Sequence, residues 1–346
     1  SLPLSMSKKV LVTGGAGYIG SHTIVELNKV GYEPVILDDF RNSKPSVIDG
    51  LQKILGKETE LLNFDVCDTE RIAQYLSKEE VCGIIHFAAY KAVGESVVNP
   101  LKYYQNNIEG LVSILKAVSK EADIPFVFSS SCTVYGEPKG QKEVSEQTAK
   151  TIPTAPYGFT KWLGEQIIED LYHSNHELRM MSLRYFNPIG AHESAFIGEL
   201  PIGKPNNLLP FITQTAAGVH EKLTIFGNTY PTVDGTCVRD YIHVVDLAEA
   251  HVKALEFLLG QRMGCNEIVN IGTGKGSSVL EVVDAFEKVN EVTVNYEFGP
   301  KRQGDVIEIY ANVDYAKSLL GWQAKKTIND AVRDAWRWEK SIRSKE

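Results

Sequence analysis

Three residues near the middle of the chain have side chains that could together take a proton from a hydroxyl group. Tyr157 and Lys161 stand four apart in PYGFTK, so on a helix both side chains would lie on one face. A tyrosine near its reference pKa of about 10 is a poor base at neutral pH, and a neighbouring ammonium stabilises its phenolate. Ser131, in FVFSSSCTVYG, could bind the oxygen that loses the proton. Tyrosine and lysine at this spacing also occur on ordinary helix surfaces, so the serine matters to the prediction.

A glycine-rich segment near the start of the chain predicts where the accompanying hydride would go. VLVTGGAGYIGSH joins an apolar run to Gly14, Gly17 and Gly20, ahead of a helical pattern. The first glycine permits a tight turn, the second lets the backbone approach a pyrophosphate, and the third lets the helix pack on the strand. N–H groups at the start of that helix then bind phosphate. The spacing predicts a dinucleotide site, although glycine turns can also be purely structural.

An acidic residue favours one of the two nicotinamide cofactors. Asp38 ends the second apolar run, eighteen residues after Gly20, where a carboxylate can bind the ribose hydroxyls of the adenosine. Its negative charge would repel a 2′-phosphate, so the sequence predicts NAD rather than NADP. Arg41 lies close by and is the kind of residue that could accommodate that phosphate.

Alternating β-rich and helical segments must position these residues. Strands are predicted at 9–13, 33–38, 60–65, 83–88, 125–130 and 179–186, and helices at 18–30, 68–78, 106–120 and 157–173. This alternation is typical of a doubly wound parallel (Rossmann) α/β sheet, which binds ligands at the carboxyl ends of its strands. We expect an NAD-binding domain at 6–186, with a return of the chain near 239–274. The rest of 187–346, where glycine and proline become frequent, is expected to form mainly a smaller α/β substrate domain.

Composition argues against several classes of protein. The 346 residues carry a net charge of −8 and no lysine- or arginine-rich block, which favours neither nucleic acid nor an anionic membrane surface as a partner. No apolar run approaches the ~18 residues of a membrane span. Residues 1–5 do not resemble a signal peptide, and we expect Met6 to be the natural start. The five cysteines are widely spaced, which predicts neither a disulfide framework nor a metal site. These features predict a cytoplasmic protein.

Several longer motifs carry a resemblance to a known family. From about Lys8 to Trp338 the chain contains, in order, VTGGAGYIGSH, HFAAYKAVGES, YYQNN, FSSSCTVYG, PYGFTK, LRYFNPIGAH, PNNLLP, VRDYIHVVDLA and RQGDV. On these motifs it resembles the extended short-chain dehydrogenase/reductases, and within them the nucleotide-sugar 4-epimerases. The resemblance implies an NAD-dependent isomerase of galactose metabolism. Such an enzyme interconverts UDP-glucose and UDP-galactose through a 4-keto intermediate, as a cytoplasmic homodimer.

The resemblance also implies roles for individual residues. Tyr157 would be the catalytic base, with Lys161 and Ser131 as its partners. NAD would be bound by Tyr157, Lys161 and a set along the strand ends: Gly14, Gly17, Tyr18, Ile19, Gly20, Asp38, Asp39, Asn42, Ser43, Asp65, Val66, Phe87, Ala88, Lys91, Asn106 and Phe186. The UDP-sugar would contact Ser131, Tyr157, Asn187, Asn207, Leu208, Arg239, Arg302, Asp305 and Ile309. Cys132 replaces the usual alanine and is expected to pack as a small buried residue. Asp39 replaces the usual asparagine, which reinforces the preference for NAD.

Three other functions are compatible with part of this pattern. A sugar 4,6-dehydratase would carry Asp-Glu after the threonine of the strand-end motif, whereas Val134 follows Thr133 here. A non-catalytic NAD-sensing protein would typically lack the tyrosine or the lysine. An N-acetylhexosamine-specific 4-epimerase stays open because of Ile309. In the family, a cysteine at that position tends to accompany N-acetylhexosamine substrates and a tyrosine accompanies glucose and galactose alone, and isoleucine is intermediate in size.

Overall fold

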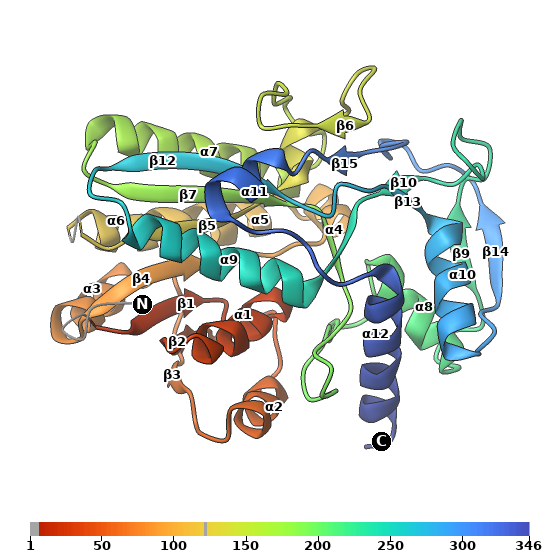
Figure 1. Ribbon diagram of the computed structural model, residues 1–346, viewed down its shortest axis with the longest axis horizontal. Helices are drawn as coiled ribbons and strands as arrows, with labels where there is room; N and C mark the ends of the chain where they lie inside the picture. The colour runs from red at the N-terminus through yellow and green to blue at the C-terminus, as the bar shows by residue number, and fades with distance from the viewer. Residues whose placement is uncertain (1–6, 121–122, 346) are drawn as a thin grey trace.

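A seven-stranded parallel sheet forms the centre of the computed structural model, which describes residues 7–120 and 123–345 (Figure 1). The predicted start at Met6 lies outside the described residues. In spatial order the strands are β12 (Cys265–Ile271), β7 (Arg179–Tyr185), β5 (Phe126–Ser131), β4 (Val81–His86), β1 (Lys9–Thr13), β2 (Glu33–Leu37) and β3 (Glu60–Leu62). The order reverses between β1 and β4, where a doubly wound sheet opens a crevice for ligands. The predicted fold class is confirmed.

Helices cover both faces of the sheet because its strands are apolar on both sides. Val10 and Val12 of β1 pack into one hydrophobic cluster and Leu11 into the other, as the two-residue period of a strand requires. The first cluster is covered by α1 (Tyr18–Lys29), α2 (Ser46–Leu55), α9 (Val244–Leu259) and α11 (Asp314–Leu320). The second is covered by α3 (Thr69–Lys78), α6 (Gly110–Ser119) and α7 (Pro156–Ser174).

The helix α2 and the start of the 106–120 helix differ from prediction. Gly50 in the middle of α2 weakens its helical pattern, but a Cβ there would collide with the Phe196 carbonyl oxygen. Glycine therefore lets α2 lie against the 196–197 segment. The helix predicted at 106–120 begins earlier, as the π-helical turn η1 (Tyr104–Glu109), before continuing as α6.

A smaller second layer forms from the later part of the chain (Figure 1). Its core holds Ile212, Phe286 and Val332, none of which is exposed to solvent. The elements around that core are α8 (Leu208–Ala216), α10 (Val279–Asn290), α12 (Ile328–Arg343), β9 (Leu223–Phe226) and β14 (Tyr296–Gly299). The remaining elements are short: α4 (Val93–Val98), α5 (Pro100–Tyr103), the 3₁₀ turn η2 (Cys132–Tyr135), β6 (Glu143–Val144), β8 (Asn187–Ile189), β10 (Val238–Arg239), β11 (Tyr241–His243), β13 (Ser277–Ser278) and β15 (Tyr310–Ala311).

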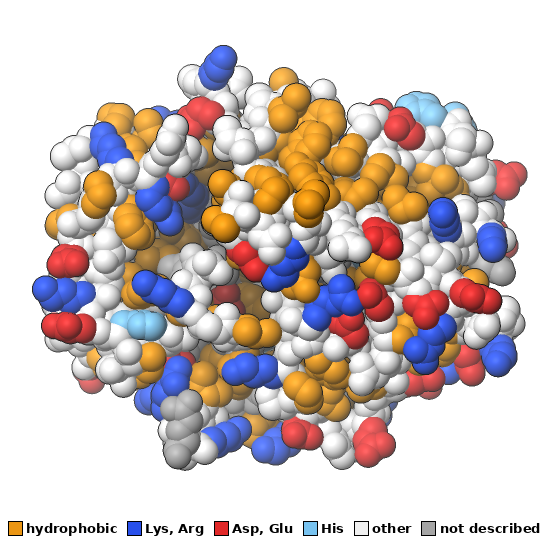
Figure 2. All heavy atoms as spheres, turned by 180° about the vertical axis from the view of Figure 1, so that it is seen from behind, with side chains coloured by type: hydrophobic (Ala, Val, Ile, Leu, Met, Phe, Trp, Pro, Cys, Tyr) orange, Lys and Arg blue, Asp and Glu red, His pale blue; other side chains and the backbone are white. Residues whose placement is uncertain are grey.

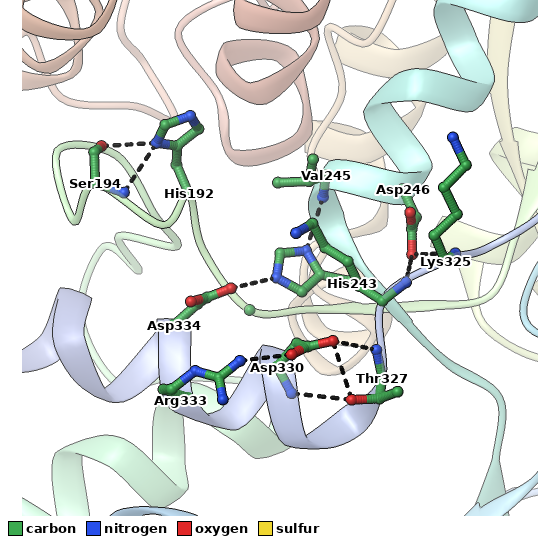
Figure 3. A network of polar contacts seen from close by, with 12 residues as sticks. His192, Ser194, His243, Val245, Asp246, Lys325, Thr327, Asp330, Arg333 and Asp334 are labelled. Atoms are coloured by element: carbon green, nitrogen blue, oxygen red, sulfur yellow. Dashed lines mark hydrogen bonds and ion pairs between the residues drawn. The ribbon is translucent and has the colours of Figure 1, made fainter.

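Polar contacts tie the second layer to the sheet (Figure 3). His243, just before α9, donates from Nε2 to Asp334 Oδ2 of α12 over 2.8 Å, and its Nδ1 accepts from the Val245 N–H. The Asp246 carboxylate in α9 accepts from the backbone N–H of Lys325 over 3.1 Å. These contacts hold α12 and the segment before it against β11 and α9. Within the described residues, the structure contains no helix with the length and apolarity that a membrane span needs.

Candidate active site

The end of β5 and the start of α7 bring the predicted catalytic residues together. Ser131 is the last residue of β5, and Tyr157 is the second residue of α7, one turn before Lys161. Tyr157 and Lys161 are 5% and 3% exposed. Lys161 donates from Nζ to the Ser129 carbonyl over 2.7 Å, and the Tyr157 N–H donates to Ser96 Oγ over 3.1 Å. The lysine is thus anchored to β5, on the same helix face as the tyrosine.

Burial works against the charged forms of both residues. It raises the pKa of Tyr157, and hydrogen bonds with the Tyr185 and Ser131 hydroxyls partly offset that rise. Burial, together with the charge of the nearby Lys91 ammonium, lowers the pKa of Lys161 to about 7. Near neutral pH, therefore, Tyr157 is a phenol and Lys161 is close to the midpoint of its titration. A positive charge brought into the site would favour the tyrosine phenolate.

The glycine loop provides a cradle that side chains would fill. Gly14 has φ +68°, and a Cβ there would lie 2.8 Å from the Ala88 nitrogen. A Cβ on Gly20 would collide with the Gly14 carbonyl oxygen. Gly17 precedes α1, and in the part of the chain that the structure describes no side chain caps the first N–H groups of that helix. These groups are placed to bind a pyrophosphate, so the residues fit NAD.

Asp38 is held at the adenosine end of this cradle. Its carboxylate accepts from the backbone N–H groups of Ala16 and Phe40, over 3.1 and 2.8 Å, and from Ser43 Oγ over 3.1 Å. Burial raises its pKa, and the two backbone hydrogen bonds oppose that rise. The carboxylate therefore has a fixed orientation beside the loop, as ribose recognition requires.

Arg41, the residue that could have favoured NADP, is engaged by other groups. Its guanidinium donates to Asp39 over 2.8 Å, to Asp65 over 2.5 Å and to Asn106 Oδ1 over 3.0 Å. Two carboxylates thus neutralise the charge that a 2′-phosphate would need. This arrangement favours NAD, in agreement with the sequence prediction.

A cleft of about 410 Å³ joins the cradle to the catalytic residues. Figure 2 shows a hollow on this side of the molecule, with hydrophobic side chains inside it and lysine or arginine side chains at its rim. The predicted residues that line the cleft are Gly14, Gly17, Tyr18, Ile19, Gly20, Asp38, Asp39, Asn42, Ser43, Asp65, Val66, Phe87, Ala88, Lys91, Asn106, Ser131, Tyr157, Phe186, Asn187 and Asn207. As far as the described residues define it, the lining does not include Lys161, Leu208, Arg239, Arg302, Asp305 or Ile309.

In this structure, Arg302, Arg239 and Ile309 contact other protein groups instead of lining the cleft. Arg302 forms an exposed pair with Asp305, with Nε and Nη2 at 2.9 and 3.2 Å from its carboxylate oxygens. Arg239 donates from Nη1 to the Val238 carbonyl over 3.0 Å. Ile309 is 4% exposed and packs in a cluster with Phe186, which itself lines the cleft. Ile309 therefore stands behind the wall of the cleft rather than in it.

Sequence reasoning missed two titratable residues that line the cleft. Tyr185 ends β7, and its hydroxyl interacts with that of Tyr157. Its position at a strand end in LRYFN was an available signal. Glu199 accepts from Asn207 Nδ2 over 2.7 Å, and burial raises its pKa to about 7. It lies in an irregular segment, where no periodicity points to it.

Cys132 also lines the cleft, next to Ser131. Burial raises the pKa of its thiol to about 12, although the charge of Arg239 opposes the rise. The thiolate is the reactive form of cysteine, so this residue is an unreactive thiol near neutral pH. That finding favours the packing role expected from the sequence.

The doubly wound sheet, the glycine loop with an acid after β2, and the Tyr–Lys pair define a site of the NAD-dependent short-chain dehydrogenase/reductase class. The family model for GDP-mannose 4,6 dehydratase matches residues 11–335. The chain is 48% identical to UDP-glucose 4-epimerase of Bacillus subtilis, over 96% of this chain and 97% of that one. It is 45% identical to the enzyme of that name from Drosophila melanogaster, over 95% of this chain and 96% of that one.

Two solved structures share its architecture. A UDP-glucose 4-epimerase from Stenotrophomonas maltophila, with bound NAD and formylated UDP-arabinopyranose, has a TM-score of 0.95 and 44% identity, and the match covers 98% of this chain and 100% of that one. A UDP-glucose 4-epimerase from Bifidobacterium longum, with NAD⁺ and UDP, has a TM-score of 0.91 and 40% identity, covering 96% and 98%. The chain belongs to the UDP-glucose 4-epimerases of the extended short-chain dehydrogenase/reductase family.

Proposed function

We propose that the chain interconverts UDP-glucose and UDP-galactose by oxidising and re-reducing carbon 4 of the sugar. The observation that carries the proposal is that Tyr157 and Ser131 line one cleft with the glycine loop, while Lys161, one turn after Tyr157, is anchored to β5. NAD held by the glycine loop would supply the acceptor for the C4 hydride and its source in the return step. Tyr157 takes the O4 proton in the first step and gives it back in the second, so no net redox change occurs.

The binding residues of the proposal divide between two sides of the cleft. The residues that line the cradle hold NAD, with Asp38 on the adenosine ribose. Asn187 and Asn207 hold the UDP-sugar from the cleft wall. Arg239 and Arg302 bind the diphosphate, for which planar guanidinium groups are well shaped. Because the two arginines lie outside the cleft lining, the proposal requires them to turn toward the substrate when it binds.

The test of this function is incubation with UDP-galactose and no added cofactor. UDP-glucose should form while NADH absorbance stays low, because the same hydride returns to the sugar. Stoichiometric NADH, or a 4-keto-6-deoxy product, would show a dehydrogenase or a dehydratase instead. A purified chain that lacks bound nicotinamide is first loaded with NAD, so that loss of cofactor is not mistaken for lack of activity.

The proposal includes a homodimer in the cytoplasm and the domain division expected from the sequence. Apolar side chains of α4 and α5 support the dimer: Val97, Val98 and Leu101 are 61%, 86% and 78% exposed. Neighbouring exposed apolar residues often mark protein interfaces. Sedimentation should give the mass of a dimer, and Leu101→Lys should shift it toward the monomer. A parent protein that sediments as a monomer at assay concentration would contradict the dimer while leaving the reaction intact.

A further inference from the structure

The Ser131 hydroxyl accepts two hydrogen bonds from one residue. The Thr133 backbone N–H donates to Ser131 Oγ over 3.2 Å, and Thr133 Oγ1 donates to the same atom over 3.0 Å. A hydroxyl has two acceptor lone pairs and one proton. With both acceptor positions occupied, the function left to Ser131 is to donate its own O–H.

The fold fixes this arrangement. Ser131 is the last residue of β5 and caps the 3₁₀ turn η2 with its side chain. Val134 and Tyr135 in that turn are fully buried, which anchors the turn in the core. Thr133 directly precedes these anchored residues and lines the cleft. Its hydroxyl is therefore held toward Ser131 by the backbone of the turn.

The donor that remains is near the proposed base, because Ser131 and Tyr157 line the same cleft and their hydroxyls interact. We propose that Thr133 is a positioning residue that keeps Ser131 a hydrogen-bond donor, so that Tyr157 exchanges the proton with sugar O4 directly. This inference rests on the proposed function. A relay through Ser131 would require its Oγ to accept the O4 proton while losing its own. That step needs a free lone pair on Oγ and would break the hydrogen bond from Thr133.

In the direct step, one proton moves between sugar O4 and Tyr157 while one hydride leaves C4 or returns to it. In the oxidation, the O4–H bond breaks and its proton goes to the Tyr157 phenolate. Its electron pair completes the C4=O double bond as a hydride leaves C4 for the acceptor that NAD would supply. The reduction reverses each change. Ser131 keeps its proton throughout and stabilises whichever neighbouring oxygen carries negative charge.

Two variants test the role of the Thr133 hydroxyl. Thr133→Val removes the hydroxyl and keeps the shape, whereas Thr133→Ser keeps the hydroxyl and is the matched control. Loss of one hydrogen bond should lower kcat by about three- to tenfold, and the limb of the kcat profile that rises with pH should move to higher pH. Thr133→Ser should behave like the parent. An unmoved pH profile in Thr133→Val, or equal losses in both variants, would overturn the proposal.

Two further measurements separate this inference from the proposed function. Ultraviolet titration of the NAD-loaded protein, with Tyr157→Phe as the reference, should show phenolate formation at higher pH in Thr133→Val than in the parent. If the parent does not convert UDP-galactose, the proposed function fails, and this titration still tests Thr133. In single turnovers of an active parent, the rate should fall linearly with the deuterium fraction of the solvent, as one transferred proton requires. A bowed dependence would show the relay.

Discussion

The two sides of the cleft hold their residues in different ways. On the cofactor side, the glycine loop and Asp38 stand at strand ends and a helix start, and the backbone N–H groups of Ala16 and Phe40 fix Asp38. On the sugar side, Arg239, Arg302 and their neighbours stand on or beside irregular segments and lie outside the cleft lining. A parallel sheet brings all its carboxyl ends to one edge, whereas loops carry no such rule. The cofactor side is therefore preformed, and the substrate side must adapt.

The largest effect should come from the preformed side. Tyr157→Phe removes the proton acceptor and keeps the buried ring, so the epimerisation rate should fall by about 10² or more on general-base magnitudes. The bound NAD content and the melting temperature should stay near those of the parent. Near-normal turnover in a folded, NAD-loaded variant would show that another group is the base.

Lys161 tests the electrostatics of the same side. Its ammonium is present below its pKa of about 7 and is lost as the pH rises through that value. Lys161→Met removes the charge at every pH, so the Tyr157 pKa should rise further. At fixed neutral pH the rate should fall by about ten- to a hundredfold, which corresponds to one or two pKa units. The pH profile of kcat checks this, and a profile whose rising limb does not move would contradict the pairing.

The wall of the sugar pocket should tune substrate choice. Ile309 and Phe186, which lines the cleft, belong to one buried cluster, so we expect the size of Ile309 to limit how far that wall can move. We expect efficient turnover of UDP-glucose and UDP-galactose and weak turnover of their N-acetylated counterparts, lower by about ten- to a hundredfold, because overpacking costs about 1–3 kcal/mol. Ile309→Cys should raise the N-acetylated activity, and Ile309→Tyr should abolish it. Equal kcat/KM for both substrate pairs, unchanged in Ile309→Tyr, would show that Ile309 is not a gate.

Cofactor choice should depend on Asp38. Asp38→Ala removes the ribose acceptor and the charge that repels a 2′-phosphate, so NAD should bind about tenfold more weakly, as expected for a lost charged hydrogen bond. NADP should gain only in relative terms, since Arg41 stays paired with Asp39 and Asp65. Calorimetry on the cofactor-free protein measures both affinities. Equal binding of the two cofactors by the parent would refute the role of Asp38.

Regular elements could be predicted from the sequence because each has a simple period. The helix expected at 18–30 is α1 at Tyr18–Lys29, and the strand expected at 125–130 is β5, displaced by one residue. The helix α2 was not predicted because Gly50 interrupts its helical pattern. Glycine is needed there because the Phe196 carbonyl lies close by, and Phe196 is far away in the sequence. The strand expected at 60–65 ends after three residues, at Leu62, on the edge of the sheet.

The same distinction holds for the residues of the site: those on regular elements could be predicted, and those in irregular segments could not. Lys161 and Tyr157 could be paired from their spacing, since a helix fixes the geometry of residues four apart. Glu199 could not be found, because its contact with Asn207 bridges two points of an irregular segment. The hydrogen bonds from Arg41 to Asp65 and Asn106 likewise join separate segments of the chain. The sequence does not reveal these bonds, so from the sequence alone Arg41 could also bind the 2′-phosphate of NADP.

The smallest effect on the free energy of unfolding should come from a substitution on the sugar side. Arg302 is 58% exposed in its pair with Asp305, and exposed pairs contribute about 0–1 kcal/mol. Asp305→Ala should therefore change the free energy of unfolding by less than about 1 kcal/mol. It should still raise KM for UDP-galactose, if Asp305 and Arg302 serve the substrate.

The matched control is the buried pair of Glu165 and Arg184, at 1% and 3% exposure and 2.6 Å. Glu165→Gln leaves a buried arginine without its counter-charge and should cost about 3–5 kcal/mol. Urea unfolding of both variants measures the difference. A loss of several kcal/mol in Asp305→Ala would show that Asp305 supports the fold. A normal KM would show that the sugar side binds its substrate through other residues. Either result would remove the contrast between a rigid cofactor side and an adaptable sugar side at this position.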